Sequence, residues 1–242
     1  MFRDKPKSIK WIPLSYDADL IVPSPQPAKR YIPQWYKDTP IWRGGSKKIT
    51  NYPDGQWDSN ATFKKCTPFL DPYMSGYIQE LWCDVTFYHK DGKLAVDYDS
   101  TIPPVSIRDG TSYLMIDEGY EQIELVWHTQ WEPITPSGYS TLYTHPHNRP
   151  DLPFSSLTGV IDTDSWSVPG TYPFLLRKGF VGTIPAGTPI YQMIPFKRDE
   201  WDSHKLDFSE ETEKTIDNNL RKLKFHVTDG YKKMHWNRKK YD

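Results

Sequence analysis

The chain has 242 residues, 37% of them hydrophobic and 15% aromatic, and its formal net charge is −1. This length suits one large or two small domains, and the near-neutral charge excludes an electrostatic surface spread over the whole molecule for nucleic acid or membranes. No apolar run approaches the ~18 residues of a membrane helix, no signal peptide is expected, and Cys66 and Cys83 are too few for a disulfide framework.

Residues 1–60 form a segment rich in proline and aromatic residues. Its prolines at positions 13, 23, 25, 27, 33 and 40 exclude a continuous helix. One helical turn is expected over Pro33–Lys37. We therefore predict an extended N-terminal arm that packs its tryptophans against the protein's own core or a neighbouring subunit: Trp11, Trp35 and Trp42.

Strand patterns fill residues 61–201. Alternating residues on both sides of Asp91-Gly92 predict a β-hairpin with a two-residue turn. Further strands follow at short spacing and are separated by Gly- and Pro-containing turns, one of them at Pro169-Gly170. The predicted strands are Gln122–His128, Gly138–Thr144, Leu157–Ile161, Tyr172–Leu176, Phe180–Ile184 and Thr188–Phe196.

Residues 202–242 are predicted to form one helix and a basic tail. Ser209 is the expected N-cap, and an apolar stripe of Ile216, Leu220 and Leu223 is expected to pack on the β-core or on a partner. The tail, residues 230–242, mixes lysines with aromatic residues, which is typical either of a docked terminus or of nucleic-acid binding. The fold class is therefore mainly β: an antiparallel sandwich of the jelly-roll or β-clip type, with the arm and the helix attached.

The segment 145–164, "HPHNRPDLPFSSLTGVIDTD", carries the candidate site residues. Two histidines and a carboxylate, here His145, His147 and Asp151, form a ligand set used for non-haem iron. With Gly138 and Gly159 they resemble the first cupin motif, and Gly179, Pro185 and Gly187 resemble the opening of the second, although Ile190 stands where the cupin histidine would be. The resemblance implies a divalent transition metal and an oxygenase or isomerase; without it, no cofactor is expected.

A second resemblance leads to different chemistry. "GVIDTD", residues 159–164, followed by Gly187, Ile190 and Gln192, is similar to the β-clip nucleotide hydrolases, the dUTPase and dCTP deaminase group. The resemblance implies that Asp162 activates water as a general base. The chain lacks that group's upstream Arg-Ser motif and its glycine-rich phosphate-binding end.

A third interpretation is purely structural. Asp and Asn side chains beside Pro and Gly commonly fix turns, and Arg149 is expected to hold Asp162 or Asp164 in a bidentate ion pair. Arg149, Asp162 and Asp164 are therefore catalytic candidates in one hypothesis and a link between strands in the other.

The widest resemblance spans residues 30–201. The segments "IPQWYKDTP", "KKCTPFLDPYMSGYI", "ITPSGYSTLYTHPHNRPDLPF", "GVIDTDSW" and "GTPIYQMIPFKRDEW" are similar to a family of uncharacterised bacteriophage and bacterial proteins. This resemblance implies a phage-like origin but no activity. Together with the aromatic ends of the chain and the lack of a complete catalytic motif, it leads us to expect a phage-associated, non-catalytic structural or assembly protein of the host cytoplasm or the virion. Its expected partners are other protein subunits, in a homo-oligomer or a virion, with nucleic acid as a further expectation for the tail and no membrane.

Overall fold

The computed structural model describes residues 7–53, 57–108, 114–165, 170–225 and 229–242. The chain forms two compact units. Unit 1 contains Met1–Tyr31, Ser75–Arg198 and Tyr241–Asp242, and unit 2 contains Ile32–Met74 and Asp199–Lys240. The expected division at residues 60 and 201 differs from these bounds: the predicted arm is shared between both units, and the last two residues of the predicted tail belong to unit 1. Pro169 and the Leu223 side chain, singled out above, lie outside the described part of the chain.

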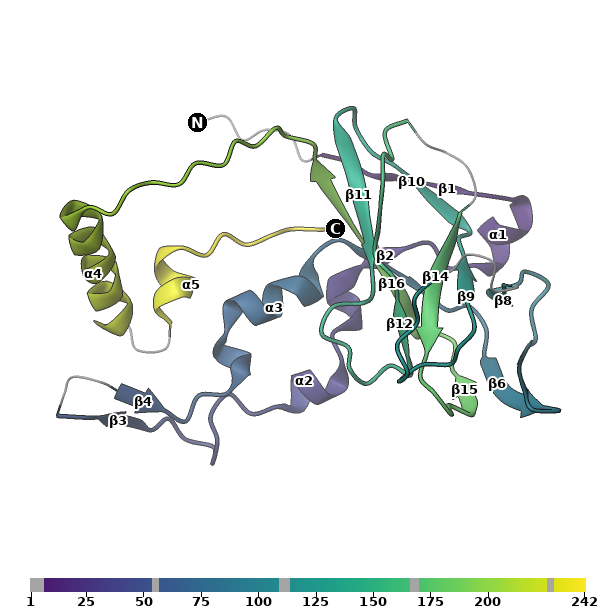
Figure 1. The fold of residues 1–242 in the computed structure, drawn as a ribbon, viewed down its shortest axis with the longest axis horizontal. Coiled ribbons are helices and arrows are strands. Elements are labelled where there is room, and N and C mark those ends of the chain that lie inside the picture. The colour runs from purple at the N-terminus through teal and green to yellow at the C-terminus, as the bar shows by residue number, and fades with distance from the viewer. Residues whose placement is uncertain (1–6, 54–56, 109–113, 166–169, 226–228) are drawn as a thin grey trace. The chain divides into compact units, whose positions relative to one another are not determined.

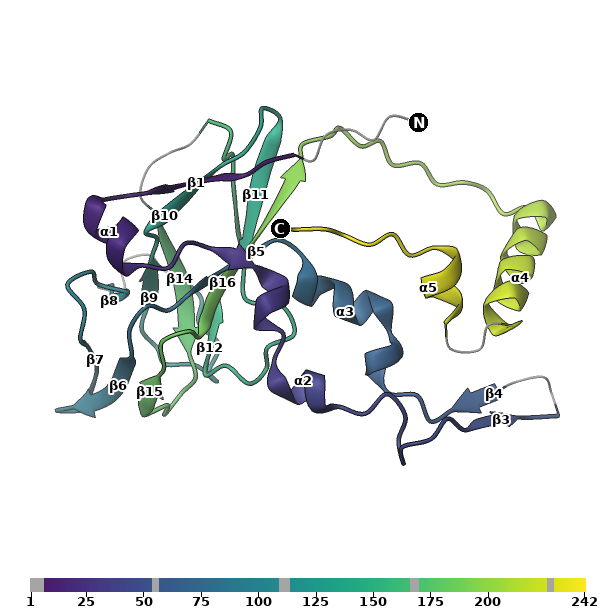
Figure 2. The same cartoon turned by 180° about the vertical axis from the view of Figure 1, so that it is seen from behind.

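Unit 1 is mainly β, and the strand pairings among its described residues are antiparallel (Figures 1 and 2). Its largest sheet has the order β13-β11-β16-β5-β2, and a second sheet has the order β12-β14-β9-β8. Their bounds are β2 (Gln26–Pro27), β5 (Tyr77–Glu80), β8 (Val105–Ile107), β9 (Leu125–His128), β11 (Tyr139–Thr144), β12 (Phe154–Ser156), β13 (Gly159–Ile161), β14 (Thr171–Leu176) and β16 (Pro189–Lys197).

Two smaller sheets complete unit 1. β15 (Gly182–Ile184), β6 (Val85–Lys90) and β7 (Lys93–Tyr98) form one, and β1 (Lys10–Pro13) pairs with β10 (Trp131–Ile134) in the other. Two short helical segments belong to the N-terminal part, α1 (Tyr16–Ile21) and η1 (Ala28–Tyr31). The first part of the predicted arm is therefore integrated into sheets of unit 1, because β1 and β2 pair with β10 and β5.

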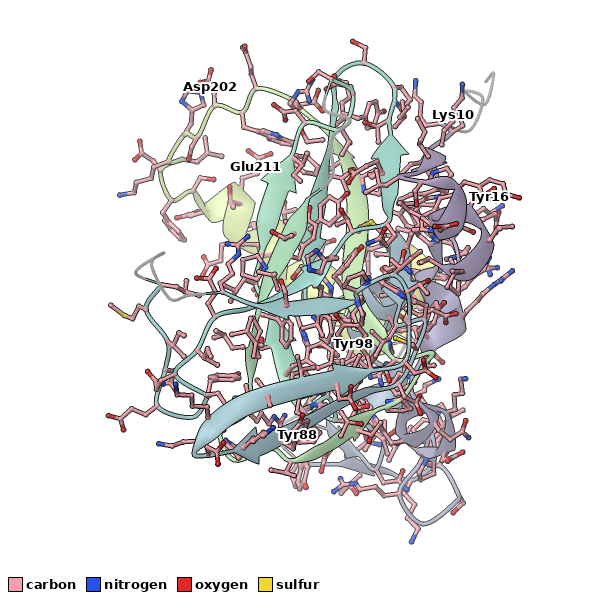
Figure 3. All side chains as sticks on the ribbon, turned by 90° about the vertical axis from the view of Figure 1, so that its right-hand side faces the viewer. Lys10, Tyr16, Tyr88, Tyr98, Asp202 and Glu211 are labelled. Atoms are coloured by element: carbon pink, nitrogen blue, oxygen red, sulfur yellow. The ribbon has the colours of Figure 1, made fainter. Side chains whose placement is uncertain are left out.

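The predicted hairpin is confirmed. β6 and β7 pair as far as Lys90 and Lys93, so Asp91 and Gly92 alone form the turn. Both have positive φ, 52° and 75°, as a type I′ turn requires. Tyr88 and Tyr98 lie on its two strands (Figure 3).

Aromatic side chains dominate the core of unit 1. Trp127 on β9 stacks on Phe174 of β14 with ring centroids 3.9 Å apart, and Tyr143 on β11 stacks on Tyr172 of β14 at 4.3 Å. Strands of both larger sheets thus contribute to one buried cluster. Offset aromatic stacking adds to the burial of apolar area that holds such a core together.

The predicted strands after residue 120 are confirmed with bounds shifted by one to three residues at one or both ends, but several elements were missed. The missed ones include β1, β2, β8, β10, β12, α1 and a helix of unit 2, α3 (Thr67–Met74). They are short or contain proline, as β10 does at Pro133 and α3 at Pro72, so their local pattern is weak.

Unit 2 is a set of short helices and one hairpin. Its elements are α2 (Gln34–Asp38), β3 (Ile49–Asn51), β4 (Trp57–Ser59), η2 (Phe63–Lys65), α3, α4 (Glu210–Phe225) and α5 (Gly230–Met234). Rings from α2, η2 and α3 pack together, with Tyr36 and Tyr73 centroids 5.1 Å apart. Cys66 of this unit and Cys83 of unit 1 are both free, but they are not buried as expected: Cys66 is exposed and Cys83 is half-buried.

The predicted C-terminal helix is α4, and its N-cap is Ser209, whose Oγ accepts a hydrogen bond from the Thr212 N–H at 3.1 Å. Its stripe is not buried within the chain, because Ile216 is 53% exposed and Leu220 48%, and the packing of the stripe on a partner stays a prediction. Among the described helices, none has the length and apolar character to cross a bilayer.

Candidate functional site

The two histidines of the candidate metal set lie in a loop. β11 ends at Thr144, so His145 and His147 follow the strand instead of projecting from one face of it, as the alternation suggested. Pro146 cannot donate a ladder hydrogen bond and ends the strand there. Asn148 has φ 54°, a left-handed conformation that turns the chain towards Arg149.

His145 uses both ring nitrogens in contacts with the backbone. Its Nδ1 accepts the Ser156 N–H at 3.2 Å, and its Nε2 lies 3.4 Å from the Arg149 carbonyl oxygen. Burial is the main cause that lowers the pKa of His145, so the neutral ring with its proton on Nε2 satisfies both contacts. The imidazole thus ties the loop to β12.

His147 is held by a buried glutamine. Gln192 Oε1 on β16 accepts hydrogen bonds from the His147 N–H at 2.9 Å and from its Nδ1 at 3.0 Å. The Gln192 amide nitrogen donates to the Ser75 carbonyl oxygen at 2.6 Å. A fully buried amide that bonds three groups fixes the loop position, because leaving any of its polar atoms unpaired costs about 1–3 kcal/mol.

Asp151 pairs with Arg149. Arg149 Nε and Nη2 approach the two carboxylate oxygens at 2.9 and 2.8 Å, which is bidentate geometry. Among the residues that the structure describes, no three His, Cys, Asp or Glu side chains form a group able to hold a metal ion. The structure therefore does not bring His145, His147 and Asp151 together as a ligand set.

Asp162 and Asp164 converge on Arg198, at the end of β16. Arg198 Nη1 lies 3.2 Å from Asp162 Oδ1 and 3.0 Å from Asp164 Oδ1. Asp162 also accepts the Ser140 hydroxyl at 2.6 Å, and Asp164 accepts the Gly138 N–H at 2.8 Å. The expectation that Arg149 holds these aspartates was wrong, because Asp151, two residues away, takes its guanidinium.

Arg198 and its hydrogen-bond partners join three parts of the chain. These are the start of β11, the segment that follows β13, and the end of β16. The hydrogen bond from Arg198, followed by that from Gly138, lowers the pKa of Asp164 to about 2. Asp162 is 61% exposed and already carries a cation and a hydroxyl on one oxygen. This arrangement stabilises the negative charge of Asp162 and links strands. A general base, by contrast, needs the proton of a bound substrate within reach.

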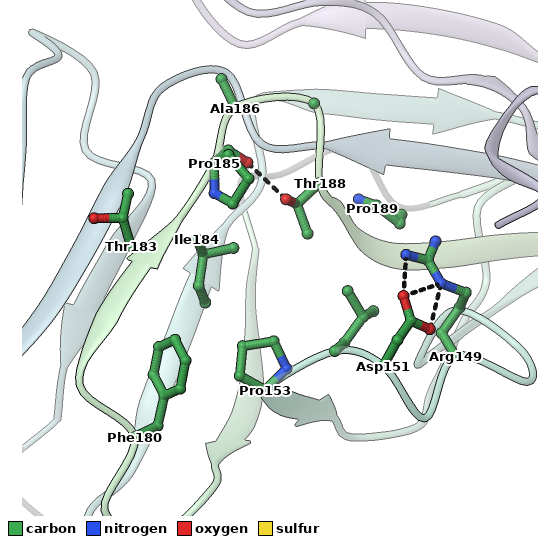
Figure 4. Close-up of a pocket in the computed structure, with 12 residues that line it drawn as sticks. Arg149, Asp151, Pro153, Phe180, Thr183, Ile184, Pro185, Ala186, Thr188 and Pro189 are labelled. Carbon is green, nitrogen blue, oxygen red and sulfur yellow. Dashed lines mark hydrogen bonds and ion pairs between the residues drawn. The ribbon is translucent and has the colours of Figure 1, made fainter. Parts of the chain in front are cut away.

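One pocket of about 550 Å³ lies beside the candidate segment (Figure 4). Its lining is mostly apolar, and its two charged residues, Arg149 and Asp151, are paired with each other at one side. The histidines, Asp162 and Asp164 do not line it. The lining residues are Arg149, Asp151, Leu152, Pro153, Phe180, Thr183, Ile184, Pro185, Ala186, Gly187, Thr188 and Pro189.

A further acidic residue, Glu132, was missed by the sequence analysis. It lies on β10 and is 4% exposed, and its Oε1 accepts the Thr129 hydroxyl at 3.0 Å. Burial raises its pKa to about 7, against the opposing hydrogen bonds of Thr129 and Gly170. Its place in "WEPI", where every other residue is apolar, was the available signal.

No protein-family model matches the chain, and no curated protein matches it. The site is therefore interpreted from its own geometry.

Proposed function

We propose that the chain is a non-catalytic structural or assembly protein that works through protein–protein contacts. The candidate catalytic and metal-binding residues support this proposal, because their polar groups bond to other parts of the same chain. Gln192 and Ser156 hold the histidines, and Arg198 holds the two aspartates. Such contacts stabilise loops and strand ends, as the structural interpretation of the segment expected.

The observation that carries the proposal is the apolar exposure of unit 2. Trp201, Leu206 and Phe208, in the segment before α4, are each more than three-quarters exposed. Ile216 and Leu220 continue this exposure on one face of α4. Large apolar side chains gathered over twenty residues are typical of an interaction site, and burying each contributes about 1.5–3 kcal/mol.

A second copy of the chain is the partner that α4 fits best. Its first turn is acidic, with Glu210, Glu211 and Glu213, and its second half carries Arg221 and Lys222. In an antiparallel pair of α4 helices, the acidic half of one helix lies beside the basic half of the other, while the apolar stripes meet between them. The resemblance to phage proteins adds the proposal that such a homo-oligomer assembles in a virion or during its construction.

Solution mass measurements test the contact. We expect the full chain to be an oligomer by light scattering, and Ile216→Asp with Leu220→Asp to give the monomer. The matched control, Lys214→Asn with Asn218→Asp, also lowers the charge by two but lies on the opposite face of α4, so it should stay oligomeric. A monomeric parent chain, or equal dissociation of the control, would contradict self-association through this stripe.

The virion part of the proposal needs a separate test. Mass spectrometry of purified phage particles should detect the chain in a constant ratio to the coat protein. Its absence from particles would remove the virion role and leave an assembly role.

A further inference from the structure

Two similar triplets, each an aromatic residue followed by two lysines, meet in unit 2. Phe63-Lys64-Lys65 forms η2, and Tyr231-Lys232-Lys233 lies in α5. They are more than 160 residues apart in sequence, and an ion pair between Lys65 Nζ and Asp229 Oδ1, at 2.6 Å, brings them together. Asp229 is the N-cap residue of α5, so the pair places one triplet beside the other.

The charge of this surface is strongly positive. Three of the four lysines act on the Asp229 carboxylate: the Lys65 hydrogen bond, with the charges of Lys65, Lys233 and Lys232, lowers the pKa of Asp229. Lys47 adds a fifth cation nearby, because it and Lys65 both lie over the Trp42 ring, at 5.8 and 5.4 Å from its centroid. Cation–π contacts of this kind hold lysines in place while leaving their charge intact.

The Lys64 ammonium group is held in place by contacts within unit 2. Lys64 lies 6.0 Å from the Tyr36 ring centroid and donates to the Thr39 carbonyl oxygen at 2.9 Å. Lys232 and Lys233 are exposed on the last turn of α5. The surface thus combines positioned cations on η2 with solvent-facing cations on α5.

Each triplet also presents an aromatic ring to solvent. Phe63 is 41% exposed and Tyr231 is 42% exposed. A duplex keeps its bases stacked inside and offers phosphates alone, whereas a single strand offers phosphates and free base faces. Cations interleaved with exposed rings are the combination that single strands use.

We propose that the two triplets form a binding surface for single-stranded nucleic acid. The lysines bind successive phosphates, and Phe63 and Tyr231 stack on bases. Only the beginning of the basic tail takes part in this surface. Farther along the tail, the Trp236 Nε1–H and Lys239 Nζ both donate to the Asp71 carboxylate, at 3.0 and 2.6 Å. These hydrogen bonds dock that part of the tail within unit 2.

The test is fluorescence anisotropy of the full chain with a labelled oligothymidylate of about 16 nucleotides, titrated between about 50 and 200 mM salt. We expect saturable binding that weakens with salt. Lys232→Ala with Lys233→Ala should weaken it and reduce the slope of log K against log salt by about 1.4, which corresponds to two phosphate contacts on a single strand.

Two matched variants separate charge from stacking. Tyr231→Leu should weaken binding by about 5-fold or more at an unchanged salt slope, because it removes a ring and no charge. Lys205→Ala with Lys214→Ala removes two exposed lysines of the same unit away from the triplets and should leave the affinity within about 2-fold of the parent.

Three outcomes would overturn the proposal. One is the lack of saturable binding of the oligonucleotide at the lower salt concentration. The second is an equal loss of affinity in the Lys205 and Lys214 control. The third is equal affinity for a duplex of the same length together with no effect of Tyr231→Leu, which would mean that the surface attracts any polyanion.

Discussion

Glu132 shows how one buried acid links the stability of unit 1 to pH. Its charge also acts on three buried tyrosines of the core. It raises their pKa values further above the usual range of a tyrosine: Tyr143, Tyr172 and Tyr191. An ionised carboxylate at this position would lose hydration without gaining a matched cation. The folded protein therefore holds the proton on Glu132 near neutral pH.

The sign of the pH dependence follows from the raised pKa. The unfolded chain releases this proton near pH 4.5 and the folded chain near pH 7, so the free energy of unfolding falls as pH rises between these values. We expect Glu132→Gln to remove this decline and to stabilise the protein above pH 7 by on the order of 2–3 kcal/mol. Urea unfolding across the window measures both effects. Parallel curves for the parent and Glu132→Gln would contradict the assignment.

Asp164 acts at the other end of the pH scale. Its pKa is lowered from 3.8 to about 2 by Arg198 and Gly138. The stability contributed by this carboxylate is therefore present above pH 3.8 and is lost as pH falls towards 2.

Two glycines show what backbone conformation contributes at the scale of an element. Gly92 in the β6–β7 turn and Gly76 before β5 have nearly equal positive φ, 75° and 71°. Their surroundings differ: a Cβ at Gly92 meets nothing within 4 Å, whereas a Cβ at Gly76 would lie 2.0 Å from the Met193 carbonyl oxygen of β16. The first position is constrained by φ alone, and the second also by the close approach of a strand.

This contrast predicts two different costs for the same substitution. Gly92→Ala should lower the free energy of unfolding by roughly 1–2 kcal/mol, the price of a left-handed alanine. Gly76→Ala should cost more, because the β5–β16 pairing has to move. Urea unfolding of the two variants provides the comparison, and equal losses would show that the Met193 carbonyl does not constrain Gly76.

At the scale of the whole molecule, ligand linkage distinguishes the proposed role from the enzymatic alternatives. A ligand that binds only the folded protein stabilises it by about 2.7 kcal/mol at 100 times its Kd. The largely apolar pocket beside Arg149 and Asp151 offers no free charge for a triphosphate, because these two residues neutralise each other.

We therefore expect no rise in the unfolding temperature of the full chain with nucleoside triphosphates or with divalent transition metals. Differential scanning fluorimetry with each ligand alone makes the measurement. A nucleotide shift that Asp162→Asn abolishes would favour the β-clip hydrolase hypothesis. A metal shift abolished by His147→Ala would favour the cupin-like one.

Local signals explain which parts of the fold were predictable. Alternation and an Asp-Gly pair define the β6–β7 hairpin, and Ser209 with the acids after it defines the start of α4. The two-residue β2 and the proline-containing β10 carry no such signal. β2 is a strand because it pairs with β5, and β10 is a strand because it pairs with β1. Neither partner lies in the local stretch of sequence.

The candidate site divides in the same way. The amino-acid sequence by itself determined an antiparallel β-rich protein with a C-terminal helix, and it singled out residues 145–164, because turn chemistry, strand alternation and helix capping act over a few residues. Only the tertiary structure decided the partners: Arg198 for the aspartates, Gln192 for His147, and Lys65 beside α5. Each of these contacts joins residues at least 34 positions apart, and chain-distant pairing depends on how strands and loops pack and not on the local pattern.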